Sequence, residues 1–277
     1  MYRRIIAVLL LGFGLLSPAD AAKKTKATKK TTATKKNAAK KTPTRSCKPD
    51  IAHCPPEGCG DPKRIDPHLN EKKNLTPADP ATEIPVTAET LDGMKTLADP
   101  STNFNRGDTR EELEALGEGR KIVVTAFLLA ARDEPDGESC NCGLHSLEET
   151  DNHLVLVSQD TVDKFPLKGK SPSALSAVLH KREPESVTAE FTPRVRLDGH
   201  PNFLKATMDP LIEKADQRAL LVRVTGMLMF DSQHFFERHL MRVNNWEIHP
   251  VLKMEFCETG TDCKADDDAG WKSIDDL

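Results

Sequence analysis

The stretch of residues 221–257 constrains the fold more than any other part of the chain. From Val222, apolar residues or Gly226 recur at every second position as far as Phe230, and the positions between them are polar except for Met227 and Met229. The alternation returns from Trp246, where Glu247 and His249 fall on the polar face. Period-two alternation is typical of strands that pack one face onto a core. The stretch therefore predicts two strands of a β domain joined by a polar loop, with Trp246 in the core.

The first 21 residues have the pattern of a secretory signal. Arg3 and Arg4 precede an apolar run over residues 5–16, and Ala19-Asp20-Ala21 forms a cleavage site of small residues. The apolar run is too short to span a bilayer. The sequence therefore predicts an exported protein, located in the periplasm or outside the cell, and the pattern suits bacterial secretion.

Charge divides the chain into two unlike parts. Residues 1–46 hold 12 of the 39 lysines and arginines and one of the 43 acidic residues. The remaining 27 basic and 42 acidic residues give the chain from residue 47 onward a net charge of −15. An acidic domain of this kind argues against nucleic acid as its partner, since phosphate backbones attract basic surfaces.

Residues 22–46 repeat Lys, Thr and Ala without a periodic apolar face. Such a segment buries too little surface to offset its ordering entropy, so we expect a disordered basic tail. It could bind anionic polymers of the cell envelope or act as a solvated spacer, and both readings stay open.

The seven cysteines favour disulfides over catalytic thiols in an exported chain. Residues 47–105 are rich in Pro, Asp and Cys, which predicts an extended arm. Within it we expect a local Cys54–Cys59 disulfide, in preference to a zinc site that includes His53. The odd count leaves at least one cysteine unpaired within a monomer.

A second disulfide is expected between the Cys140/Cys142 loop and the region of Cys257 and Cys263. The order of the predicted strands resembles that of an OB-fold barrel, which implies that the first and fifth strands end at the same pole and makes a long-range bridge geometrically possible. The competing pattern is a local bridge between Cys257 and Cys263. The sequence slightly favours the long-range bridge.

Between residues 121 and 257, the predicted elements follow the order strand, strand, strand, helix, strand, strand. The strands are expected at 121–132, 151–158, 186–197 and in the two halves of 221–257, and the helix at 201–215. Shorter helices are expected at 108–116 and 171–181. This order resembles that of the OB-fold, a mainly β five-stranded Greek-key barrel with a helix between strands three and four. The barrel domain would occupy residues 106–258, followed by a loose acidic tail at 259–277.

Five short segments also resemble those of exported bacterial proteins that have an OB-fold-like barrel and no assigned activity. They are ESCNCGL, TDNHLVLV, FTPRVR, VTGMLMFDSQH and NNWEIHPV. In OB-folds the outer face of strands two and three, with loops one-two and four-five, usually meets the ligand. The resemblance implies His153, Arg194, Arg196 and the loop 232–245 as a binding surface. Two arginines there would favour a small anionic molecule or a glycan.

Two groups of residues could instead bind a metal ion, which needs several ligands converging at about 2 Å. One group surrounds the fourth loop and consists of Asp231, His234, His239, Glu247 and His249. The second consists of Cys140, Cys142, His145, Asp151 and His153. A polar strand face and disulfide chemistry, respectively, are the favoured explanations for these groups.

The sequence lacks Gly-x-Ser-x-Gly, a phosphate-binding loop and His-Glu-x-x-His. No motif indicates a cofactor. The first hypothesis is therefore a non-catalytic binding module that is secreted or associated with the envelope. The alternative is a metal-dependent hydrolase or nuclease that uses histidines near the loop between strands four and five. A third reading is a structural partner in an envelope complex, docked through the arm at 47–105.

Export gives a direct test. If residues 1–21 are a cleaved signal, the mature protein begins at Ala22, because cleavage follows the last residue of the A-x-A site. Intact-mass measurement of protein recovered from the periplasm or medium checks this. Exported material that still carries Met1 would contradict the prediction.

Overall fold

The computed structural model of the protein describes residue 47 and residues 50–60, 65–105, 107–167, 170–235 and 241–277. The expected signal segment and basic tail lie outside this part of the chain, as does His239. In the described part, no helix combines the length and the apolar character needed to cross a membrane.

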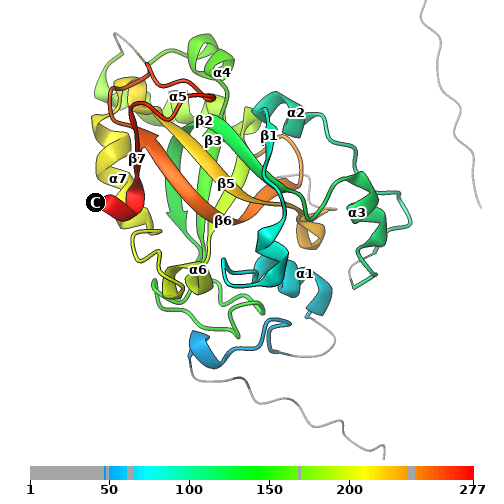
Figure 1. Ribbon diagram of the computed structural model, residues 1–277. Helices are drawn as coiled ribbons and strands as arrows, with labels where there is room; N and C mark the ends of the chain where they lie inside the picture. Colours follow the sequence, from blue (N-terminus) through cyan, green and yellow to red (C-terminus); the bar gives the residue numbers. More distant parts are fainter. Residues whose placement is uncertain (1–46, 48–49, 61–64, 106, 168–169, 236–240) are drawn as a thin grey trace, which may run out of the picture. The chain divides into compact units, whose positions relative to one another are not determined.

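Five strands close into a barrel (Figure 1), which confirms the predicted OB-like fold. Their order around the barrel is β2-β3-β4-β6-β5, with β5 pairing back onto β2. Neighbouring strands are antiparallel except β4 and β6, which are parallel. The barrel strands are β2 (Lys121–Asp133), β3 (Asn152–Val157), β4 (Val187–Phe191), β5 (Leu220–Phe230) and β6 (Trp246–Cys257).

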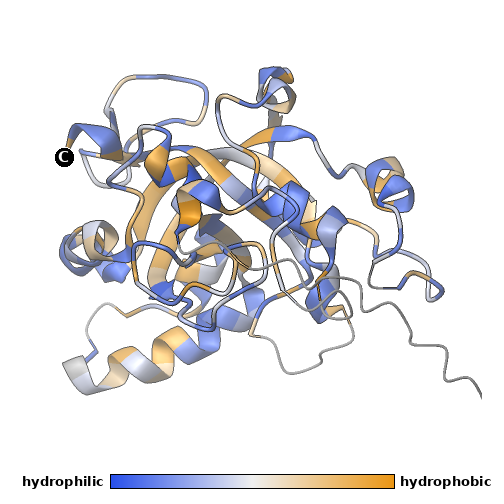
Figure 2. Cartoon of the chain, turned by 90° about the horizontal axis from the view of Figure 1, so that it is seen from below, coloured by the Kyte–Doolittle hydropathy of each residue, from blue (hydrophilic) through white to orange (hydrophobic). Residues whose placement is uncertain are grey.

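The barrel interior is filled by the apolar residues that the alternation assigns to one face (Figure 2). Trp246 is fully buried there, as predicted, and its indole Nε1 donates a hydrogen bond to the carbonyl of Ala98 at 3.0 Å. Helices and short strands pack around this core. They are β1 (Thr87–Glu89), which pairs with β2, α2 (Leu91–Lys95), α3 (Glu111–Leu116), α4 (Gln159–Lys164), α5 (Leu175–Arg182) and α7 (Lys205–Lys214).

A β-bulge in β6 fixes which of its side chains face outward. Gly226 pairs with Val251 and Leu228 pairs with Ile248, so two β6 residues lie opposite one residue of β5. The strands approach closely at this point. A Cβ on Gly226 would lie 2.5 Å from both the Ile248 side chain and the Pro250 carbonyl. Because the bulge adds one residue, both Ile248 and Val251 can face the core.

The third strand is shorter than predicted. It ends at Phe191, and residues expected at its end form helix α6 (Pro193–Leu197) instead. Thr192 is the N-cap and its side chain accepts a hydrogen bond from the amide of Val195, while Pro193 occupies the first turn. A capping Thr followed by Pro is a helix start. Apolar alternation in 186–197 concealed this signal, and Arg194 and Arg196 therefore do not lie on a strand face.

The arm at 47–105 is folded onto the barrel and is not extended. Its helix α1 (Pro67–Lys73) packs against β6. The expected Cys54–Cys59 bridge is wrong, since Cys59 bonds to Cys47 and Cys54 bonds to Cys142 across 88 residues. The arm is therefore clamped to the loop between β2 and β3.

At the C-terminus, the predicted long-range bridge is also wrong, and the competing Cys257–Cys263 pair forms. Strand β2 runs past its last partner on β5, Leu220, and continues along β3 after a bulge. This carries the Cys140/Cys142 loop to the arm. The acidic tail is not loose throughout, since β7 (Trp271–Ser273) pairs with β6 and Ile274 is buried.

The two kinds of disulfide should differ in their effect on stability. Replacing Cys54 and Cys142 by Ser should lower the free energy of unfolding by about 4–5 kcal/mol, because the bridge closes a long loop in the unfolded chain. The matched control, Ser at Cys257 and Cys263, opens a loop with a sequence separation of 6. It should cost about 2 kcal/mol. Urea unfolding measures both, and an equal loss in the two variants would contradict the loop-length argument.

Candidate functional site

A row of polar side chains crosses the outer face of the barrel. Register pairs Arg132 of β2 with His153 of β3, and His153 with Glu190 of β4. Ala189 pairs with Ile248, which brings Glu190 beside His249 of β6. All of these residues alternate with core residues along their strands, so their side chains leave the core on the same side. The row is an arginine, a histidine, a carboxylate and a histidine.

Glu190 lies between the two histidines of this row. Its Oε1 is in direct contact with His153 Nε2, and its Oε2 lies 2.9 Å from His249 Nδ1. The other nitrogen of His153 lies 3.0 Å from Glu134 Oε1, and that of His249 lies 3.8 Å from Asp151 Oδ2. The row is therefore one continuous network of alternating imidazoles and carboxylates.

The arm and the β2–β3 loop cover the far end of this network. Lys73 of α1 is buried and its Nζ lies 2.7 Å from Glu138 of the loop. Asn141 Nδ2 donates to Asp151 Oδ1 at 3.0 Å. Asn74 Nδ2 donates to the carbonyl of Cys140 at 2.9 Å. The Cys54–Cys142 bridge thus holds a lid of arm and loop over buried charges.

Arg242 connects the network to the loop between β5 and β6. Its guanidinium contacts both Asp231 and Glu247, and its side chain is only 8% exposed. Asp231 also contacts His234. Burial alone would raise the pKa of Asp231, but the hydrogen bond to His234 and the charges of Lys73 and Arg242 hold it well below its usual range.

The network carries more acidic than permanently basic groups. We call the whole set the buried charge network: Lys73, Glu134, Glu138, Asp151, His153, Glu190, Asp231, Arg242, Glu247 and His249. Six of these residues are carboxylic acids, and only the lysine and the arginine are permanent cations. The excess negative charge must be offset by protons or by another cation, because burial penalises uncompensated charge.

The pKa values of the network follow from this imbalance. Burial would lower the pKa of His249, but Glu190 and Glu247 raise it to about 10. His153 behaves in the same way, and Glu190 and Glu134 raise its pKa to about 9. Burial raises the pKa of Asp151 to about 8. It likewise raises that of Glu134 to about 7, against the opposing effect of His153.

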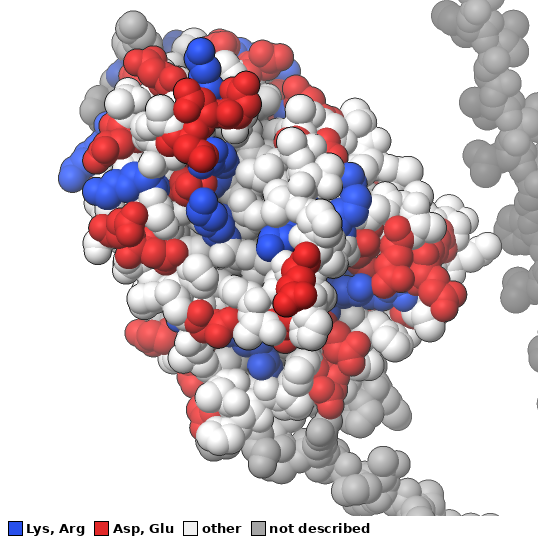
Figure 3. All heavy atoms as spheres, viewed as in Figure 1, with Lys and Arg blue, Asp and Glu red and all other residues white. Residues whose placement is uncertain are grey.

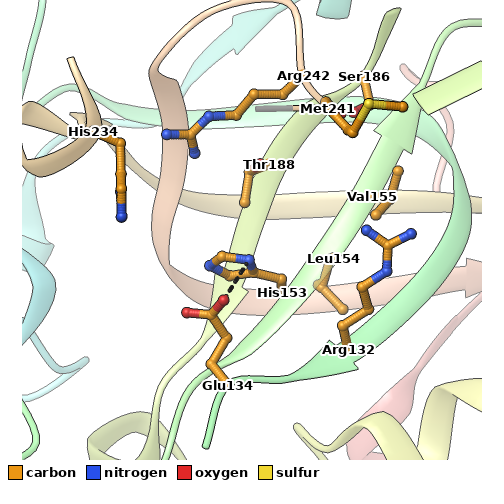
Figure 4. A pocket seen from close by; sticks show the side chains of 10 residues that line it. All are labelled: Arg132, Glu134, His153, Leu154, Val155, Ser186, Thr188, His234, Met241 and Arg242. Carbon is orange, nitrogen blue, oxygen red and sulfur yellow. Dashed lines mark hydrogen bonds and ion pairs between the residues drawn. The ribbon is translucent and has the colours of Figure 1, made fainter. Parts of the chain in front are cut away.

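A pocket of about 340 Å³ opens at the exposed end of the network. Figure 4 shows the side chains of Arg242, His234 and His153 around one space, with Glu134 ion-paired to His153. The lining is Arg132, Glu134, His153, Leu154, Val155, Ser186, Thr188, His234, Met241 and Arg242. Four of these ten side chains are basic and one is acidic.

Arg132 has the most exposed side chain among the basic residues that line this pocket. Its side chain is 50% exposed, and it contacts one carboxylate, that of Glu183. By contrast, Arg242 is enclosed by Asp231 and Glu247.

On the face drawn in Figure 3, Lys and Arg side chains are scattered among Asp and Glu side chains.

The structure brings together most, but not all, of the residues expected from the sequence. His153, Asp231, His234, Glu247 and His249 belong to the pocket or to the network beside it. Two expected residues do not. Both arginines of α6 bind backbone carbonyls, and burial lowers the pKa of each. Arg194 donates to Cys54 and Pro55, and Arg196 donates to Glu148, Thr150 and Phe203.

The second group of possible metal ligands is divided. Cys142 is in a disulfide, and Cys140 is the free cysteine, buried with its Sγ 3.5 Å from Glu138. Burial raises the pKa of the Cys140 thiol. His145 is exposed, and its Nδ1 lies 2.7 Å from the carbonyl of Pro135.

Sequence reasoning missed Lys73, Glu134, Glu138 and Arg242. Three of them lie in the arm or in loops, where no periodicity shows which way a side chain points. Glu134 could have been found, since it lies two residues beyond the predicted first strand, on the side of His153. Alternation within 186–197 also predicts that Glu190 lies on the face of the strand opposite Ala189 and Phe191, which are in the core.

Comparison of the chain with protein families, curated proteins and solved structures found no match. The site must therefore be interpreted from its own chemistry.

Arg242 provides a test of the buried charge network. Replacing it by Met keeps its apolar length but leaves Asp231 and Glu247 without their cation, so the free energy of unfolding should fall by about 3–5 kcal/mol. The matched control is Arg218→Met, whose partner Glu213 is 70% exposed. It should cost less than about 1 kcal/mol. Urea unfolding of both variants measures the difference, and similar small losses would show that Arg242 does not compensate buried charge.

Proposed function

We propose that this protein is an exported binding module whose barrel holds a small anionic molecule in the pocket beside His153. The observation that carries the proposal is the pocket lining, in which four basic side chains face one acidic side chain. The pocket lies on the outer face of β3 and β4, where OB-folds usually meet their ligands. Its volume is in the range of small-molecule sites.

The proposed ligand contact is Arg132. A carboxylate or phosphate entering the pocket could take the place of Glu183 on its half-exposed guanidinium. His153 stays protonated between Glu134 and Glu190, because its pKa is raised to about 9, and adds a positive charge beside the pocket while both of its N–H groups serve those carboxylates. The hydroxyl-bearing residues Ser186 and Thr188 complete a polar lining suited to one anionic group.

The proposed location is the periplasm or the exterior of the cell. Three disulfides fit an oxidising compartment, and the secretory pattern of residues 1–21 supports the same reading. The basic residues of 22–46 would bind anionic polymers of the envelope. The net charge of −15 from residue 47 onward argues against nucleic acid as the ligand of the folded domain.

The second candidate function is a metal-dependent hydrolase. It is favoured by one observation, the buried carboxylates and histidine that converge next to the pocket. Ser186 is not poised as a nucleophile, since its hydroxyl donates to the carbonyl of Met241. A hydrolase would therefore need a metal-activated water at this place.

Ligand binding can be tested on the full mature chain with acetate, succinate, citrate, inorganic phosphate and neutral glucose as probes. We expect at least one anion, and not glucose, to raise the melting temperature by mass action. Arg132→Gln should weaken the affinity for that anion about 10-fold or more, because a charge-assisted hydrogen bond is lost. Calorimetric titration measures the affinity.

The matched control is Arg120→Gln. Arg120 is 39% exposed and pairs with Glu89, away from the pocket lining. The Arg120→Gln variant should bind the anion with the same affinity as the unmodified protein. Binding of glucose alone, or equal weakening in both variants, would contradict the proposal.

A further inference from the structure

Beneath the pocket, a set of buried polar atoms lacks hydrogen-bond partners. Within the described residues these atoms include Asp151 Oδ2, Glu190 Oε2, Glu247 Oε2 and both ring nitrogens of His249. The four residues are at most 1% exposed. Native proteins satisfy nearly all buried polar atoms, and an unsatisfied group calls for an explanation such as a bound ion.

Close approach does not by itself satisfy these atoms. His249 Nδ1 lies 2.9 Å from Glu190 Oε2, yet the direction of the contact is wrong for a hydrogen bond. His249 Nε2 lies 3.8 Å from Asp151 Oδ2, which is beyond hydrogen-bond length. The imidazole and the carboxylates thus form ion pairs without a hydrogen bond between them.

One ligand atom from each of Asp151, Glu190 and His249 lies within 4.8 Å of the others. Ligand atoms around a tetrahedral ion, each about 2 Å from the metal, are roughly 3.4 Å apart. Small side-chain movements would therefore close this group around an ion. The ligands come from the start of β3, from β4 and from β6, which the barrel holds in fixed register.

We propose that Asp151, Glu190 and His249 bind a divalent transition-metal ion, with Zn²⁺ as the best representative. Imidazole together with carboxylates suits this class of metal, whereas Ca²⁺ and Mg²⁺ prefer oxygen ligands alone. Glu247 Oε2 lies 3.6 Å from His249 Nδ1 and can support the site. Binding would release the proton from the ligating ring nitrogen of His249, so the two charges of the ion would offset only part of the excess negative charge of the buried charge network.

A neighbouring group, Glu138, Cys140 and Asp151, also converges and competes for the ion. In this group, the Glu138 carboxylate already pairs with Lys73 at 2.7 Å, and the Cys140 sulfur contacts the same carboxylate. Only Asp151 of this group contributes an atom without a partner. The geometry therefore favours the group with His249.

The proposed site lies next to the pocket, because His153 lines the pocket and contacts Glu190. The metal site does not depend on the proposed anionic ligand, because none of its three ligands lines the pocket.

The test uses the full mature chain, stripped with EDTA and titrated with ZnCl₂ in a calorimeter. We expect one Zn²⁺ per chain. The near-isosteric variants Glu190→Gln and His249→Gln should each weaken the affinity about 100-fold, since each removes one of three protein ligands. Glu138→Gln, from the competing group, should weaken the affinity less than either ligand variant, because in the proposed site Glu138 is a neighbour of the ion and not a ligand. Circular dichroism establishes that each variant is folded.

The absence of Zn²⁺ binding to the unmodified protein would overturn the proposal. So would unchanged affinity in Glu190→Gln and His249→Gln, or a loss confined to Glu138→Gln. If the ligand variants do not fold, the unmodified protein loaded with Co²⁺ decides. A thiolate-to-cobalt charge-transfer band would place the ion on Cys140 and contradict the proposal, whereas visible cobalt bands without it would support it.

Discussion

The contact of Glu190 with His153 and His249 is the interaction on which the site depends. A carboxylate 1% exposed is costly to bury unless positive groups surround it. Its two histidines come from strands on either side, so the charges meet only when β3, β4 and β6 are in register. A slip of any one of these strands by one residue would turn its polar side chain toward the apolar interior. The site therefore forms only when the barrel closes with its strands in this register.

The arm has a clear physical role in this arrangement. It brings Lys73 to Glu138, and its Asn74 satisfies the carbonyl of Cys140. The Cys54–Cys142 bridge and the hydrogen bonds from Arg194 hold the arm in place. By excluding water, the lid strengthens each electrostatic interaction in the network below it. A segment without periodicity is thus part of the site.

A gain in the stability of the fold does not explain why the protein contains such a network. Buried charged groups can often be replaced by well-packed apolar residues without loss of stability. Here the charged groups converge at the foot of a pocket, and perturbed titratable groups in a cleft are typical of functional sites. A cationic pocket beside a carboxylate-rich cluster would allow an anionic ligand and a metal ion to bind next to each other. The two proposals concern different residues and stand separately.

Local periodicity determined the barrel. Alternation in 221–257 predicted two strands and their inward faces, including Trp246, since the pleat of a strand is read directly from neighbouring residues. It also placed Glu247 and His249 outward, whereas His153 was expected on the outer face through the resemblance to OB-folds. Tertiary structure decided the disulfide pairing, the fold of the arm and the identity of Lys73, Glu138 and Arg242 as members of the network. These depend on where loops travel after a strand ends, as when β2 bends along β3 and carries Cys142 to Cys54. No spacing within the sequence encodes such a path, because it is set by contacts between segments far apart in the chain.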